Sequence, residues 1–144
     1  MKERLNPLVR RAATVTLLAL ALAGCNMPLH RPDCPPGQTL GAERLHGSWT
    51  LALNGATTPW ALSLGPHPEH VGSLRGELRQ GTQRYPVVAD LEGRDFTMEE
   101  SHDGQRIAAT WLGTAVPGHC GRLIQGERID KDQARQGFSM QRNP

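Results

Sequence analysis

Short runs in which apolar and polar residues alternate fill the chain from Leu45 to Arg142. The segment 45–53 (LHGSWTLAL) places Leu, Gly, Trp, Leu and Leu on one side of an extended chain, and His, Ser, Thr and Ala on the other. Alternation with a period of two indicates a β-strand with one buried face. No comparable pattern indicates an amphipathic helix. We therefore expect an all-β fold whose first strand covers residues 45–53.

Seven further alternating segments follow at spacings near ten residues and are separated by glycine- and proline-rich turns. Because Val71 is out of phase with Leu74, we expect a bulge near residues 72–73. Eight short strands predict a single antiparallel meander closed as a β-barrel, which leaves no exposed edge; a β-sandwich is the alternative. The further strands are predicted at 60–64, 71–79, 85–91, 94–102, 105–113, 121–130 and 137–142.

The hairpin over residues 94–113 is the most clearly marked, because an Asp-Gly pair at 103–104 separates two alternating runs. A two-residue turn there predicts that Glu100 opposes Ile107 and that Phe96 opposes Trp111. In this register apolar residues meet apolar residues across the pair. A slip of one residue would turn all of them to the wrong face.

The same register turns Glu100 into the barrel, near its end. A carboxylate removed from water needs a partner, and we consider Arg122, Arg128 and Arg142 as candidates. Two interpretations are open. The pair is either a structural salt bridge or a Glu-Arg pair that reads a ligand.

The inward positions of the predicted strands are large and apolar. A barrel of eight strands is just wide enough to be filled by side chains or to hold one small ligand. We expect these side chains to fill most of the interior and to leave at most a shallow pocket at one mouth. The inward residues are Leu45, Trp49, Leu51, Leu53, Trp60, Leu62, Leu64, Leu74, Leu78, Val87, Leu91, Phe96, Met98, Ile107, Trp111, Phe138 and Met140.

The first 24 residues have the layout of an export signal, with a basic start and an uncharged run over 12–24. That run is too short to span a bilayer comfortably. Residues 22–25, Leu-Ala-Gly-Cys, resemble the lipobox of bacterial lipoproteins. The resemblance implies that residues 1–24 are removed and that Cys25 carries a diacylglycerol thioether and an N-acyl chain, palmitate-like anchors that hold the protein on a membrane. An ordinary secretory signal with a chance cysteine is the alternative.

The expected cleavage changes the charge of the chain. It removes four of the 16 basic and one of the 14 acidic residues, so that 12 and 13 remain and the formal charge falls from +2 to −1. A nearly neutral chain has no electrostatic footprint for nucleic acid.

We expect residues 25–40 to form a proline-rich linker and residues 41–144 to form the barrel domain. In the Gram-negative sorting pattern that the lipobox resembles, Asn26 implies delivery to the outer membrane, facing the periplasm.

Acylation of Cys25 would leave Cys34 and Cys120 as the remaining cysteines. In an exported protein two such residues are most simply a disulfide. Two unpaired thiols are the alternative, because the sequence does not establish that the two Cα atoms approach closely enough to be bridged.

Residues 47–49, Gly-Ser-Trp, resemble the Gly-x-Trp that opens the barrel in the calycin group of lipocalins and avidins. In lipocalins a basic residue of the last strand packs over this tryptophan, which implies a cation–π contact from Arg142 to Trp49. The chain is shorter than most lipocalins and lacks the aromatic residues of the avidin biotin site. Trp49 is interpreted as a core residue that closes one barrel end, with a ligand contact as the alternative.

No arrangement of residues supports catalysis. His67 and His70 are flanked by prolines that preclude a regular helix, and no further metal ligand lies at metal-site spacing. His119 and Cys120 are adjacent and would face opposite sides of a strand. No phosphate loop or dinucleotide fingerprint is present, and we expect neither metal nor cofactor.

We therefore expect a non-catalytic lipoprotein of the cell envelope that binds a small ligand or an envelope protein. A structural or assembly accessory that uses its exposed loops is one alternative. A periplasmic protease inhibitor is another, because some small bacterial inhibitors also combine a leading Gly-x-Trp strand with an eight-stranded barrel and one disulfide.

Overall fold

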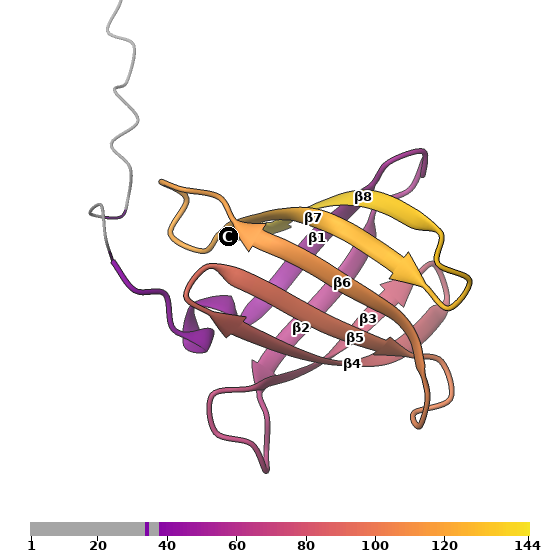
Figure 1. Ribbon diagram of the computed structural model, residues 1–144, viewed down its shortest axis with the longest axis horizontal. Coiled ribbons are helices and arrows are strands. Elements are labelled where there is room, and N and C mark those ends of the chain that lie inside the picture. Colours follow the sequence, from indigo (N-terminus) through magenta and orange to yellow (C-terminus); the bar gives the residue numbers. More distant parts are fainter. Residues whose placement is uncertain (1–33, 35–37) are drawn as a thin grey trace, which may run out of the picture. The chain divides into compact units, whose positions relative to one another are not determined.

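The computed structural model describes Cys34 and residues 38–144. Eight antiparallel strands follow one another around a closed barrel, and the last strand pairs with the first (Figure 1). The predicted all-β meander and its closure as a barrel are confirmed. The strands are β1 (Gly47–Leu53), β2 (Trp60–Pro66), β3 (Leu74–Gln80), β4 (Gln83–Glu92), β5 (Asp95–Ser101), β6 (Ile107–Ala115), β7 (Leu123–Asp130) and β8 (Arg135–Arg142).

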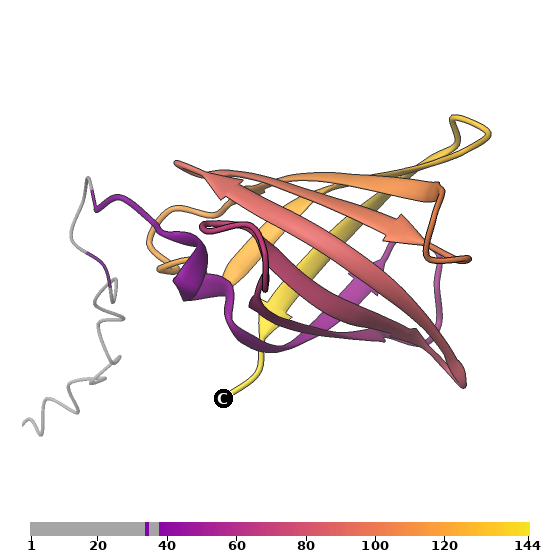
Figure 2. The ribbon, with the colours of Figure 1, turned by 90° about the horizontal axis from the view of Figure 1, so that it is seen from below.

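The two ends of the barrel differ. A short 3₁₀-helix, η1 (Ala42–Leu45), covers one end, which we call the closed end, and the C-terminus lies on the same side (Figure 2). At this end the indole N–H of Trp49 donates to the carbonyl of Leu45 at 2.9 Å, and both side chains are fully buried. Trp49 is therefore a core residue that closes this end. The opposite end, which we call the mouth, is framed by the loops 54–59, 81–82, 102–106 and 131–134.

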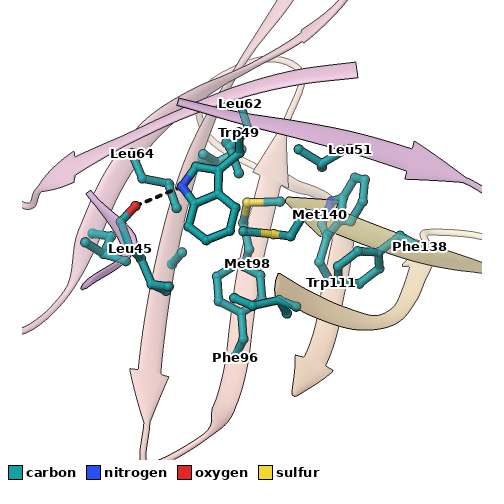
Figure 3. Packing of buried hydrophobic residues seen from close by; sticks show 14 of the residues in the cluster. Leu45, Trp49, Leu51, Leu62, Leu64, Phe96, Met98, Trp111, Phe138 and Met140 are labelled. Atoms are coloured by element: carbon teal, nitrogen blue, oxygen red, sulfur yellow. Dashed lines mark hydrogen bonds between the residues drawn. The ribbon is translucent and has the colours of Figure 1, made fainter. Parts of the chain in front are cut away.

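Apolar side chains fill the interior between the two ends (Figure 3). The predicted inward residues are buried, with three exceptions: Trp60 and Leu91 are only partly buried, and Ile107 is 54% exposed. The inward assignment of Ile107 was therefore wrong. Beyond the prediction, the cluster includes Leu40, Ala89, Ala115 and Ile124. Leu40 had been assigned to the linker, so the packed domain begins at least one residue earlier than predicted.

The register of the β5–β6 hairpin differs from the prediction. Glu100 opposes Ala109 instead of Ile107, and Ser101 opposes Ile107 across an irregularity next to Glu100. Along the strand, Trp111 is displaced by two residues and opposes Met98. A displacement of two residues keeps the residues of the regular ladder, such as Met98 and Trp111, inward because the side chains alternate, and only Ile107, beyond the irregularity, changes side. The hydrophobic pattern therefore cannot distinguish the two registers.

The cause of the displacement is a loop longer than the predicted two-residue turn. The carboxylate of Asp103 accepts the backbone N–H groups of Gln105 and Arg106 at 2.9 and 2.8 Å. These bonds lower the pKa of Asp103 well below its usual range. An aspartate that bonds its own following backbone stabilises a local turn. This turn holds residues 102–106 out of the ladder and moves Ile107 to the outer wall.

The third strand also begins later than predicted. Val71 lies in a turn and is fully exposed, and Gly72 adopts a left-handed φ of 90°. The strand starts at Leu74, where the regular alternation begins. The phase break at Val71 therefore marks the end of the loop, and the bulge predicted at residues 72–73 was wrong.

Cys34 and Cys120 form a disulfide, with Cα atoms 5.3 Å apart. The predicted pairing is confirmed. Gly121, which follows Cys120, lies close to Leu40 and Arg44, so the bond is made at the closed end. Cys25, the signal segment 1–24 and most of the linker lie outside the described residues. Within the described part of the chain, no helix is long and apolar enough to cross a membrane.

We predict that β2 and β3 can approach each other only because residue 76 in β3 is a glycine. A Cβ at this position would collide with the backbone carbonyl oxygen of Ser63 on β2. We expect Gly76→Ala to lower the free energy of unfolding by about 1–3 kcal/mol, as overpacking does, measured by urea denaturation. Gly65→Ala in β2 is the matched control, because its Cβ would meet nothing within 4 Å. Equal stability of the two variants would contradict this explanation.

Candidate functional site

Glu100 at the end of β5 is buried beneath the mouth, with only 1% of its surface exposed. Arg128 binds both of its oxygens, with Nε and Nη2 each donating at 3.0 Å. The indole N–H of Trp111 donates to Oε2 at 3.0 Å, and His102 Nε2 lies 2.7 Å from Oε1. Each carboxylate oxygen thus has two partners. This arrangement favours the structural salt bridge over a ligand-reading pair, because no oxygen is left for a ligand.

The barrel register brings these side chains together. Glu100 opposes Ala109 on β6, two residues before Trp111, and Trp111 opposes Arg128 on β7. Opposed residues of antiparallel strands project to the same face. Three neighbouring strands therefore place a carboxylate, an indole and a guanidinium on the inner face at one height.

The hydrogen bonds keep Glu100 ionised. Burial raises the pKa of its carboxyl group, but the bonds from Arg128, His102 and Trp111 together outweigh burial. The resulting pKa is lower than that of an ordinary glutamate. Bidentate bonding by arginine is among the strongest ways to hold a buried carboxylate charged.

Arg128 also lies against two aromatic rings. Its guanidinium carbon is 5.6 Å from the ring centre of Trp60 and 5.5 Å from that of Trp111. The two indoles meet edge to face at 5.9 Å, and Trp111 meets Phe138 in the same way at 5.1 Å. Such contacts fix ring orientation as well as adding stability. Arg128, which is held by Glu100, therefore fixes the position of the Trp60 ring from inside the barrel.

The other two candidate arginines lie at the closed end. The backbone N–H of Arg142 donates to the carbonyl of Arg122. Arg142 opposes Trp49 in the ladder, as the calycin resemblance implied, but its guanidinium donates to the carbonyl of Arg44 in η1 at 3.3 Å. Among the described residues, cation–π contacts are made by Arg128, with the rings of Trp60 and Trp111. The expected cation–π contact between Arg142 and Trp49 is thus replaced by a bond to η1.

A cleft of about 640 Å³ opens at the mouth, beside Trp60. It lies between the loop that joins β1 to β2 and the loop that joins β3 to β4. Trp60 is its one large apolar side chain and is half-buried, and none of the lining side chains is ionisable. The lining residues are Gly55, Ala56, Thr57, Thr58, Trp60, Gln80, Gly81, Thr82 and Gln83.

This cleft lies beside Trp60, whereas the residues considered for ligand reading in the sequence were Glu100 and its arginine partners. The pairing of β2 with β3 brings together two loops about 25 residues apart, which no local pattern reveals. The available signal was Trp60 at the start of a strand, directly after the threonine-containing loop 54–59.

The histidine pair at the tip of the β2–β3 loop is occupied by local bonds. His67 Nδ1 accepts the backbone N–H groups of Glu69 and His70, each at 3.1 Å. That nitrogen is therefore used to shape the loop. Within the described residues, no three His, Cys, Asp or Glu side chains gather as metal ligands do.

No protein-family model matches the chain. A search of curated proteins likewise finds no significant match.

Proposed function

We propose that this protein is a lipid-anchored binding protein of the bacterial envelope, whose barrel takes a small ligand in the cleft at the mouth. The observation that carries the proposal is the cleft itself: about 640 Å³ in volume, with Trp60 on its wall. Small-molecule sites are concave and combine apolar or aromatic walls with a few convergent polar groups, and here Trp60 supplies the aromatic wall and threonine and glutamine side chains the polar groups.

The place of the disulfide supports this role. Cys34 follows the expected acylation site Cys25 by nine residues and is bonded to Cys120 at the closed end. A tether at Cys25 would therefore hold the barrel by its closed end and leave the mouth free. With Asn26 behind the lipobox, the expected location is the outer membrane, facing the periplasm.

Binding is a better account of the site than catalysis. Glu100, the buried carboxylate beneath the mouth, is saturated by its four hydrogen bonds. The thiol of Cys120 is consumed in the disulfide. A general acid or base must reach the group whose proton it transfers, and Glu100 is shielded from the cleft by its partners.

Native mass spectrometry of the protein purified from bacterial membranes tests both the lipid anchor and the ligand site in the cleft. We expect a chain that begins at Cys25 and carries the mass of its acyl groups, with a further non-covalent adduct that is lost in Trp60→Ala. Leu112→Ala, which changes an exposed apolar side chain on the outer wall, should keep the adduct. An unlipidated chain would contradict the anchor, and an adduct equally retained by Trp60→Ala would contradict the site.

A further inference from the structure

We propose that the ligand of the mouth cleft is a neutral saccharide, with one sugar ring packed on the indole of Trp60. This inference rests on the proposed binding function and specifies its ligand class.

The lining is polar without being charged. Its side chains supply hydroxyl groups from Thr57, Thr58 and Thr82 and amide groups from Gln80 and from Gln83, whose oxygen already accepts the hydroxyl of Tyr85. Hydroxyls and amides both donate and accept hydrogen bonds, which matches the paired donor and acceptor character of sugar hydroxyls. A charged ligand would need a counter-charge, and the lining provides none.

Trp60 provides the apolar element that a sugar ring needs. The face of an indole is electron-rich, so it attracts the weakly positive C–H groups on one face of a pyranose. Arg128 and Trp111 fix the indole at 5.6 and 5.9 Å between centres, so little conformational freedom is lost on binding. In the described part of the chain, the indole N–H groups of Trp49 and Trp111 donate hydrogen bonds, and that of Trp60 has no protein acceptor.

Two other ligand classes fit less well. An acyl chain needs an apolar tunnel, and the interior below Trp60 is occupied by Trp111, Phe138 and the rest of the core. A peptide bound by β-augmentation adds a strand to an exposed sheet edge. The barrel is closed from β1 to β8 and has no such edge. A hydroxyl-rich, uncharged ligand remains the best match.

NMR of the indole N–H groups tests the inference on the mature protein in detergent micelles. The three tryptophans give three signals, which Trp-to-Phe variants assign. We expect cellohexaose, maltohexaose or chitohexaose to shift the Trp60 signal saturably and to leave that of Trp49 unchanged. Trp60→Ala should weaken binding about 30-fold, the effect of losing a central aromatic contact. Gln80→Leu, at an exposed position, should weaken it about threefold to tenfold without affecting the fold.

Ile107→Ala on the outer wall is the matched control and should bind as tightly as the wild type. Oligogalacturonate and tetra-alanine are the competing probes. If Trp60 responds to either of these and not to neutral sugars, or if the native adduct is of another class, the saccharide is wrong and the binding function stands. If Trp60 responds to no probe and the native mass is bare, both proposals fail.

Discussion

Arg128→Met should lower the free energy of unfolding by about 3–5 kcal/mol at neutral pH, because it leaves a buried carboxylate without its cation. Glu100 is 1% exposed and receives two of its four hydrogen bonds from Arg128. The methionine replaces much of the lost volume, so the loss reports mainly the unpaired charge. Equilibrium urea unfolding, followed by tryptophan fluorescence, measures it.

The pH dependence should change sign in this variant. In the wild type the pKa of Glu100 is lowered, so its contribution is present above the pKa of the unfolded chain and is lost as the pH falls through the folded value. Without Arg128, burial acts against the charge and raises the pKa of Glu100. In the variant the contribution of Glu100 should therefore fall as the pH rises, and the stability deficit relative to the wild type should grow between about pH 4 and pH 7.

Two further variants distinguish the effect of leaving a buried carboxylate unpaired from the effect of removing any arginine. Arg135→Met breaks an exposed pair with Glu127, whose side chains are 63% and 53% exposed, and should cost less than about 1 kcal/mol. Combining Glu100→Gln with Arg128→Met removes both charges and should recover most of the loss. A double variant no more stable than Arg128→Met alone would show that packing around the arginine, and not the charge, determines the effect.

The alternation of residues predicted which side chains point inward far better than which residues pair. A strand with a period of two specifies its faces, whereas a register displaced by two residues preserves them. The β5–β6 pairing therefore depended on the loop. There the carboxylate of Asp103, which bonds the N–H groups of Gln105 and Arg106, overrode the two-residue turn that the Asp-Gly pair suggested.

The partner of Glu100 was beyond a sequence argument for a related reason. Arg122, Arg128 and Arg142 all lie in the last part of the chain, and the choice among them depends on height along the barrel axis. Strand tilt and stagger set that height. The structure places Arg128 beside Glu100 because β6 lies between β5 and β7, with Trp111 opposite Arg128.

The cleft likewise could not be predicted from the sequence, because it depends on how the strands are arranged around the barrel. Trp60 was predicted as an inward residue, but its role at the mouth depends on a loop about 20 residues further along the chain. Its orientation depends on Arg128, which is further away still. Local patterns identified the aromatic residue, and only the closed barrel shows that a buried ion pair fixes its position.

Replacing both Cys34 and Cys120 by serine should lower the free energy of unfolding by about 4 kcal/mol. The disulfide joins residues 86 apart in the sequence, and the chain-entropy model assigns about 3 kcal/mol to a 15-residue loop and about 4.7 kcal/mol to a 100-residue loop. The Cα separation of 5.3 Å lies within the usual range for disulfides. Urea unfolding of the purified protein measures the loss.

Reduction supplies the control for this last effect. Dithiothreitol should shift the unfolding midpoint of the wild type to that of the double serine variant and should leave the variant itself unchanged. The loss should add to that of Arg128→Met, because the disulfide is at the closed end and Glu100 lies beneath the mouth, and distant sites are usually independent. A loss below about 1 kcal/mol would mean that Leu40 and η1 hold the N-terminal segment against the barrel without the covalent bond, and that the unfolded chain gains little freedom from its removal.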